Sequence, residues 1–478
     1  MMKREEVVAV EKEGEARKKG GGGEETASAF INFQVISAAY CTLTFTDGGL
    51  RTMILLNVAE LGFTPIQIAL MFTLYELLGV VVNLFGGSLA TRIGLKGSCL
   101  LGLLLQVVSL SLAAIAGELF DTTTQRGSYL AYITCVQALA GAAKDLLKIS
   151  GKSVTKLVVK SKRKDEEGTK LFRLVAYITG AKNSIKGLGM FLGGVILWGI
   201  GYWQGLTMFA VMNILPTPFV YLYVDNSLGV SKKHIPLRKV CQTTRSVGQL
   251  SLARFWLYGS RDVWFEIAAP VFLKRGMGLP HGLVSFMMGG YTIVYGKLQA
   301  LSNVLCTRTP TPRSVSPWTA VLGILTAGSG VAFFLGHGNE PSNFDERRWW
   351  AIAIICCVFY VAFAVVMAVV SAVHSFLIVA YAGRDKVAKD VGFYYMANAG
   401  GRLVGTLLSG IVYEYTGDEW GISVCLWLSA GFLLIACVTS ITLPPLPGAS
   451  EGGNGEGKNP PSAEETKDIS LVVSRTRN

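Results

Sequence analysis

Charged residues are scarce in this chain. Only 16% of its 478 residues are charged, against about 25% in an ordinary soluble domain. Hydrophobic residues make up 51% of the chain and its mean hydropathy is +0.44. A soluble protein of this composition would expose large apolar patches, which monomers rarely do. The composition therefore excludes a soluble enzyme, a coiled coil and a disordered protein, and it indicates a protein that lies in a bilayer.

Motifs for metal binding, disulfides or covalent chemistry are also lacking. The nine cysteines show no paired spacing, and the adjacent Cys356 and Cys357 lie in an apolar run, where core packing is expected. No nucleophile and base stand at a recognisable spacing. We therefore predict no metal, no cofactor and no enzymatic activity. The net charge of +12 could suit nucleic acid. However, the basic residues lie between apolar runs, so we expect a cytoplasmic membrane face and no nucleic-acid partner.

The apolar runs are long enough to be membrane-spanning helices. A span needs about 20 residues, and the runs are continuous rather than alternating, which excludes a barrel. We predict an all-α membrane protein with twelve transmembrane helices in two six-helix halves. The spans are expected near 31–58, 66–90, 98–117, 128–150, 172–200, 204–225, 251–273, 281–305, 316–336, 350–380, 390–414 and 421–443.

The predicted domains follow from these spans. A disordered tail without a secretory signal (1–28) precedes the N-terminal half (29–225). A cytoplasmic linker (226–250) joins it to the C-terminal half (251–444), and a second disordered tail follows (445–478). The connections on the side of the termini hold 20 Lys and Arg residues against five in the other connections. The positive-inside rule therefore places both termini in the cytoplasm.

The two halves repeat residues at nearly one offset. Pro65 and Pro280 are 215 residues apart, as are Asp47 and Asp262. At an offset of 216, Lys186 matches Arg402, and Gly189 and Gly194 match Gly405 and Gly410. These matches include costly intramembrane charges, so they favour a duplicated six-helix unit. Two such halves describe the major facilitator architecture.

Ionisable residues inside the spans are the candidate functional residues, because each one needs a partner, a cavity or a function. Lys144, Lys148, Lys152 and Lys156 recur every fourth residue and form one helix stripe, and Lys182 and Lys186 repeat that spacing. Few carboxylates are near them in sequence, so an anionic substrate is expected to balance the lysines. The predicted substrate-binding set is Arg51, Lys144, Lys148, Lys182, Lys186, Arg261, Lys297, Asn398 and Arg402.

A second set is expected to balance charge or carry protons: Asp47, Glu76, Asp145, Asp262, Glu266 and His374. Glu76 has no basic neighbour at helical spacing, which makes it the first candidate for a proton carrier. For Asp47 and Arg51, four residues apart, an internal ion pair is the alternative to a substrate role. For His374 the alternative is a satisfied polar residue. Arg254 lies near the cytoplasmic end of its span, outside both sets.

Two levels of family resemblance are present. The segment 87–96, Gly-Ser-Leu-Ala-Thr-Arg-Ile-Gly-Leu-Lys, resembles the major facilitator motif between spans 2 and 3, but it departs from the motif at Thr91 and Leu95. A closer resemblance, from about residue 40 to 415, is to the organoarsenical efflux branch of that superfamily. The segments that carry it begin at Phe45 (FTDGGLR), Ala140 (AGAAKDLLKISGKS), Thr179 (TGAKNSIKG), Tyr258 (YGSRDVWF), His374 (HSFLIVAY) and Val391 (VGFYYMANAGGRLVGTLLSG).

This resemblance implies export of 1-arseno-3-phosphoglycerate, which a glyceraldehyde-3-phosphate dehydrogenase makes from arsenate. Arsenate resistance would follow. We expect a monomer in the plasma membrane that works by alternating access with proton coupling. The lysines alone would equally suit another phosphorylated organic acid, such as a sugar phosphate exchanged for phosphate. A non-transporting receptor on the same fold is the alternative from another functional class.

Overall fold

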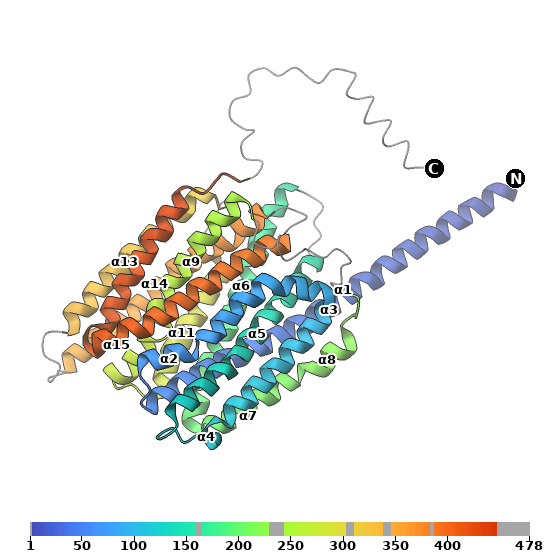
Figure 1. The fold of residues 1–478 in the computed structure, drawn as a ribbon. Coiled ribbons are helices and arrows are strands. Elements are labelled where there is room, and N and C mark those ends of the chain that lie inside the picture. The colour runs from blue at the N-terminus through green and yellow to red at the C-terminus, as the bar shows by residue number, and fades with distance from the viewer. Residues whose placement is uncertain are drawn as a thin grey trace, which may run out of the picture.

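The computed structural model describes residues 2–158, 164–228, 243–302, 310–337, 346–382 and 387–446. These residues form one bundle of long helices without any strand (Figure 1). The all-α fold class is therefore confirmed. The tail after residue 446, most of the expected linker and part of the 161–170 segment lie outside the described residues.

The N-terminal half consists of helices that cover the first six expected spans. They are α1 (Met2–Glu60), α2 (Pro65–Met71), α3 (Thr73–Ala114), α4 (Ala116–Leu119), α5 (Arg126–Val158), α6 (Lys164–Gly199), α7 (Tyr202–Ile214) and α8 (Pro216–Tyr223). The first part of α1 projects from the bundle (Figure 1), and the domain boundary expected at residue 28 stays a prediction.

The C-terminal half covers the other six spans. Its elements are α9 (Arg245–Phe265), α10 (Ala268–Val271), the π-helix η2 (Phe272–Gly276), α11 (His281–Ala300), the 3-10 helix η3 (Pro312–Ser314), α13 (Val315–His337), α14 (Glu346–Tyr381) and α15 (Val387–Ile441). Helix α9 begins at Arg245, six residues before the span expected there, because Thr244 caps it by accepting from the Val247 backbone N–H.

Glycines and prolines divide the longest helices. Gly94 in α3 and Gly417 in α15 have φ angles of 74° and 71°, which residues with a side chain rarely adopt, so each long helix turns there between two spans. Pro216 starts α8 directly after α7 within one span. Pro270 lacks an N–H, and its ring crowds the carbonyl four residues earlier, at Glu266, which is where α9 ends.

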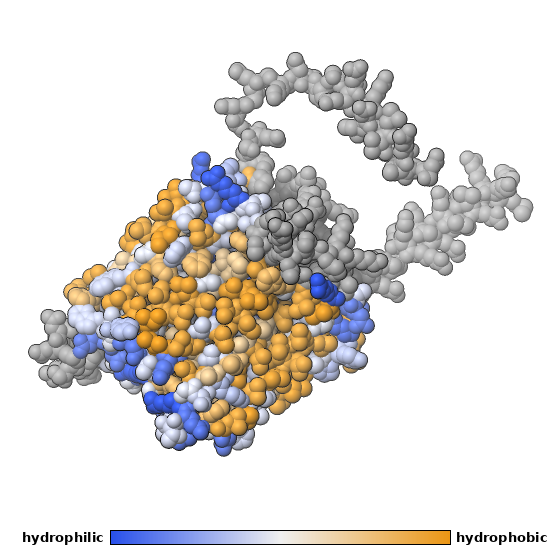
Figure 2. Space-filling model, viewed as in Figure 1, coloured by the Kyte–Doolittle hydropathy of each residue, from blue (hydrophilic) through white to orange (hydrophobic). Residues whose placement is uncertain are grey.

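Seven helical stretches are long and apolar enough to cross a membrane. The last of them, Lys389–Ile441, is long enough for two crossings. Figure 2 shows a broad hydrophobic band across one face of the bundle, with hydrophilic residues gathered at its ends. Among the long helices in the described parts of the chain, α1, α6, α9 and α11 do not meet the same criterion. Helices α1, α6 and α9 carry charges within the bundle, and all four helices line its central cavity.

The same close helix contact occurs in both halves. In the N-terminal half, a Cβ atom on Gly189 of α6 would collide with the carbonyl oxygen of Phe45 in α1. In the C-terminal half, a Cβ atom on Gly405 of α15, the position that matches Gly189, would collide with the carbonyl oxygen of Gly259 in α9. Glycine therefore allows the first and fifth spans of each half to touch through their backbones. This repetition agrees with the predicted duplication.

Candidate substrate-binding site

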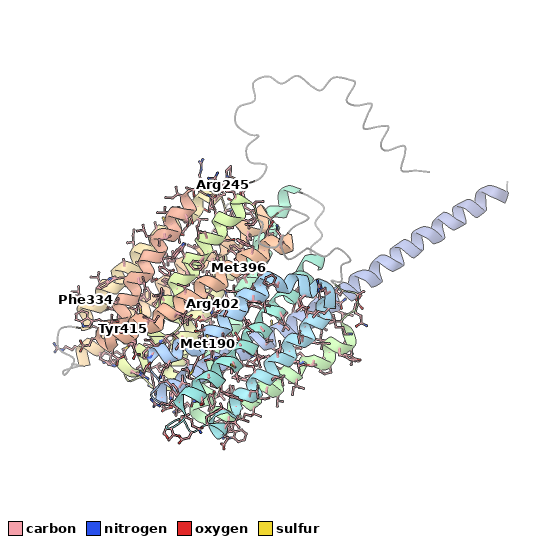
Figure 3. The ribbon with its side chains drawn as sticks, in the orientation of Figure 1. Met190, Arg245, Phe334, Met396, Arg402 and Tyr415 are labelled. Atoms are coloured by element: carbon pink, nitrogen blue, oxygen red, sulfur yellow. The ribbon has the colours of Figure 1, made fainter. Side chains whose placement is uncertain are left out.

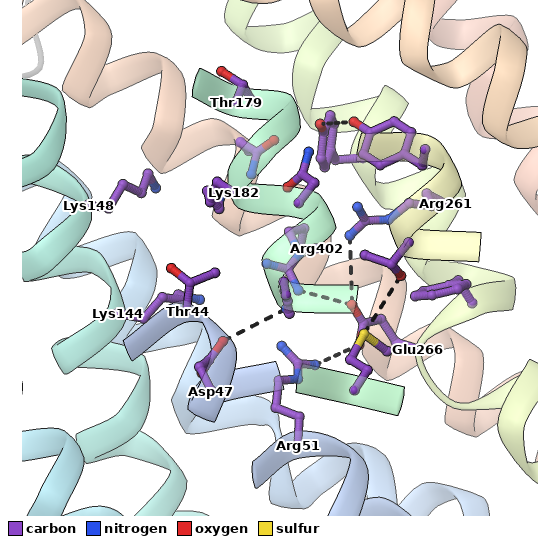
Figure 4. Close-up of a pocket in the computed structure, with 18 of the residues that line it drawn as sticks. Thr44, Asp47, Arg51, Lys144, Lys148, Thr179, Lys182, Arg261, Glu266 and Arg402 are labelled. Atoms are coloured by element: carbon purple, nitrogen blue, oxygen red, sulfur yellow. Dashed lines mark hydrogen bonds and ion pairs between the residues drawn. The ribbon is translucent and has the colours of Figure 1, made fainter. Parts of the chain in front are cut away.

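A central cavity of about 280 Å³ lies between the two halves. Its lining comes from α1, α3, α5 and α6 on one side and from α9, α11 and α15 on the other. Figure 3 places Arg402 in the middle of the bundle, between Arg245 near one end and Tyr415 near the other. Figure 4 shows lysines from α5 and α6 on one side of the cavity, with Arg261 and Glu266 on the other. Its volume suits a small molecule.

A closed ring of four charged side chains joins the halves at the cavity. Arg51 donates to Glu76 Oε1 at 2.8 Å and to Glu266 Oε2 at 2.7 Å. Arg402 lies 2.9 Å from Glu76 Oε1 and 3.0 Å from Glu266 Oε1. Each half supplies one arginine and one glutamate, so two sides of the ring, Arg51–Glu266 and Arg402–Glu76, cross between the halves. The ring is buried, with Arg51 only 5% exposed and Glu76 fully enclosed.

A second pairing repeats in both halves. Arg402 Nε donates to Asp262 Oδ2 at 2.8 Å, and at the matching positions Lys186 Nζ lies 3.9 Å from Asp47 Oδ2. Asp47, in the looser of the two pairs, also accepts a hydrogen bond from the Tyr75 hydroxyl at 2.7 Å. Each half thus places a carboxylate of its first span beside a cation of its fifth span. The offset of about 215 residues predicted this correspondence.

The lysines form a separate group on the N-terminal side. Lys148 donates to Asp145 Oδ1 at 2.8 Å and to Asn83 Oδ1 at 2.7 Å. Lys144 lies 3.6 Å from Asp145 Oδ2 and 3.9 Å from the centre of the Tyr75 ring. Within the described part of the chain, Lys182 forms no ion pair, although it lines the cavity. Lys144 and Lys148 share Asp145, and Glu76, 4.0 Å from Lys144 Nζ, is already paired with Arg51 and Arg402, so a positive charge remains.

Several sequence predictions about these residues need correction. Glu76 is not unpaired, because Arg51 and Arg402 reach it from other helices. The alternative pair of Asp47 with Arg51 does not form among the described residues, since Arg51 turns to the two glutamates. Lys297 is exposed on α11 and does not line the cavity.

The remaining predicted residues fall in or beside the cavity. His374 is buried on α14 but is not part of the lining. Asn398 lines the cavity and accepts from Arg254 Nε at 3.0 Å. Arg261 also lines the cavity, and its Nε donates to Asp262 Oδ1 at 2.6 Å. Sequence reasoning left Arg254 out because of its position near the end of its span, yet its side chain is only 2% exposed and lines the cavity.

Comparison with known families agrees with this architecture. The family model described as Major Facilitator Superfamily matches residues 250–475, a little under half of the chain. The match begins at the start of the C-terminal half. The N-terminal half contains a corresponding set of helices. The chain has the major facilitator fold. The match supports a membrane transporter of that superfamily, whose members are typically transporters rather than enzymes. No curated protein matched the chain.

Contacts between the two halves also close one end of the cavity. Arg275 donates to the carbonyl oxygens of Ala59 at 3.1 Å and Phe63 at 2.6 Å. His281 Nε2 lies 2.8 Å from Glu60 Oε2. Along α1 the cavity lining runs from Phe33 to Leu56, toward the end of the bundle from which the chain termini leave.

Proposed function

We propose that this chain exports a small, multiply charged organic anion by alternating access. The observation that carries the proposal is the charge of the cavity. Eight cations line it: Arg51, Lys144, Lys148, Lys182, Lys186, Arg254, Arg261 and Arg402. Four carboxylates also line it, and Asp262 behind them makes a fifth. Three positive charges are left over. Uncompensated charge inside a membrane protein is costly, and an anionic substrate would compensate it.

The substrate that we propose is 1-arseno-3-phosphoglycerate. The segments that resemble the organoarsenical efflux branch include the lysine helix, the Asp47–Arg51 segment and the Asn398–Arg402 segment, all of which supply cavity residues. A three-carbon anion suits a cavity of about 280 Å³, which is at the small end of ligand pockets. The negative charges of this substrate would compensate the three excess positive charges of the cavity. A glyceraldehyde-3-phosphate dehydrogenase would supply the compound.

The ring of Arg51, Glu76, Arg402 and Glu266 gives the transport cycle a physical basis. Two of its ion pairs cross between the halves, so the halves cannot separate at the ring while both pairs are intact. An anion that binds the arginines competes with the glutamates for the same N–H donors. We propose that this exchange loosens the ring and lets the halves move, and that a glutamate released from its arginine accepts the coupled proton. Glu76 would then carry a proton only when the ring opens.

Arsenate tolerance in an arsenic-sensitive host tests the proposal. The transporter alone, the dehydrogenase alone and both together are compared, with membrane insertion verified by surface labelling. We expect tolerance, and loss of labelled arsenic from the cells, only when both proteins are present. Lys186→Ala should remove tolerance without reducing insertion. Absence of protection by correctly inserted protein would reject the organoarsenical substrate. Counter-flow of labelled phosphate from loaded vesicles would then identify an organic-phosphate exchanger, whereas ligand binding without flux would indicate a receptor.

We further propose that the transporter acts as a monomer in the plasma membrane with both termini in the cytoplasm. The orientation of the termini in this proposal rests on the 20 basic residues in the connections on their side. Labelling of single cysteines introduced in the 61–64 and 445–450 segments of intact cells would test the orientation. Only the 61–64 position should react with an impermeant reagent.

A further inference from the structure

Arg254 occupies a buried polar pocket on the C-terminal side of the cavity, away from the ring glutamates. Its Nε donates to Asn398 Oδ1 at 3.0 Å, and one terminal nitrogen donates to Ser371 Oγ at 3.3 Å. The guanidinium stacks on the Tyr258 ring at 3.8 Å. Within the described residues no carboxylate pairs with it. Arg254 therefore carries a full charge that neutral groups hold in place.

The hydrogen bonds around Ser371 fix the direction in which its hydroxyl group donates. Ser371 Oγ accepts from Arg254 at 3.3 Å and from Gln299 Nε2 at 3.1 Å. A serine hydroxyl has two lone pairs and one proton, so its proton must go to the Tyr258 oxygen, 2.7 Å away. The Tyr258 and Tyr295 hydroxyls lie 3.0 Å apart, and one of them donates to the other. One of the two tyrosine protons therefore has no acceptor in this network.

The pocket consequently offers free N–H and O–H donors beside an uncompensated positive charge. A guanidinium has five N–H donors, and the contacts of Arg254 with Asn398 and Ser371 occupy only two of them. Both Arg254 and Tyr295 line the cavity. An arrangement of fixed N–H and O–H donors around an uncompensated positive charge matches the oxygens of a phosphate-type or carboxylate anion.

We propose that Arg254 and Tyr295 form a second anion subsite, so that the transported molecule is a short organic anion with a charged group at each end. One end binds the lysine group around Lys182, on the N-terminal half, and the other binds Arg254, on the C-terminal half. This inference rests on the proposed anion transport. It adds the substrate class: molecules with two separated anionic groups are preferred over those with one. A substrate that touches both halves would also couple its binding to their movement.

Two probes that share one carbon chain test the inference. Propane-1,3-diyl bisphosphate has an anionic group at both ends, and propyl phosphate has one. Binding of each is measured on the full-length protein purified in detergent. Arg254→Gln should weaken binding of the bisphosphate about tenfold or more, because a charge-assisted hydrogen bond is lost, and should leave propyl phosphate within about twofold. Lys182→Gln should weaken both probes, because both need the lysine end.

Two further variants separate a binding role from a folding role. Arg254→Lys keeps the charge and should retain part of the preference for the bisphosphate. Tyr295→Phe removes only the hydroxyl and should weaken the bisphosphate selectively. Lys297→Gln, on the exposed side of α11, is the matched control and should change neither probe.

The outcomes distinguish this inference from the function on which it rests. Equal loss of both probes in Arg254→Gln, or no loss of either, overturns the second subsite while anion binding stands. Failure of the wild-type protein to bind either probe contradicts the proposed anion transport itself.

Discussion

Replacing Arg402 by Gln removes one corner of the charged ring and keeps a polar side chain there. Arg402 contacts three carboxylates, at 2.8 Å for Asp262, 2.9 Å for Glu76 and 3.0 Å for Glu266. Loss of one partner from a buried ion pair costs about 3–5 kcal/mol. Each of these carboxylates retains a second arginine, so we expect the lower end, about 3 kcal/mol, as the loss in free energy of unfolding.

The companion variant Glu76→Gln tests whether the ring acts as one unit. Alone it should also cost about 3 kcal/mol, since it leaves two arginines to share Glu266. Independent effects would add to about 6 kcal/mol in the double variant. Because both substitutions remove the same Arg402–Glu76 ion pair, its loss counts only once in the double variant, and we expect only about 3–4 kcal/mol.

Denaturant unfolding of the detergent-purified protein, followed by tryptophan fluorescence, measures these losses from the shift in midpoint. Lys297→Gln is the control and should stay within about 0.5 kcal/mol of wild type, because that side chain is exposed and outside the cavity. A double variant that loses the full sum of the two single variants would refute the coupled ring.

Three further predictions concern other parts of the molecule. Lys182→Gln should weaken phosphate binding about tenfold in an equilibrium binding assay, since it removes a cation without a carboxylate partner in the described structure; unchanged affinity would argue against the lysine site. Gly189→Ala should lower the thermal midpoint, because its methyl group would meet the Phe45 carbonyl oxygen, whereas Gly290→Ala on α11, with open space around it, should not. Arg275→Gln should open the closed end of the cavity and increase labelling there by an impermeant thiol reagent; unchanged labelling would mean that other contacts hold that end shut.

The sequence was sufficient to predict the seven apolar spans, because a long apolar run can be recognised without knowledge of its neighbours. It also predicted the correspondence of Asp47 with Asp262 and of Lys186 with Arg402, since a duplicated unit repeats residue types at one offset. The structure shows that these residues form equivalent pairs in the two halves.

The charge pairing could not be predicted in the same way. The partners of Glu76 are Arg51 and Arg402, which lie 25 and 326 residues away in the chain. Spacing along one helix reveals only partners on that helix, so it wrongly predicted that the Glu76 carboxyl group is unpaired. Likewise, Lys297 lies on a cavity-lining helix but on its exposed side, and the rotation of that helix depends on packing against α6 and α14 rather than on the residue itself.

Transport of labelled arsenic into inside-out plasma-membrane vesicles tests the central claim most directly. The vesicles contain the full-length protein and receive glyceraldehyde-3-phosphate dehydrogenase, its aldehyde substrate, NAD and labelled arsenate. The account predicts accumulation only when the dehydrogenase reaction is complete, and loss of accumulation in Lys186→Ala vesicles that contain equal amounts of protein. Accumulation of arsenate without the dehydrogenase, or no accumulation with it, would contradict export of an organic arsenate by this cavity.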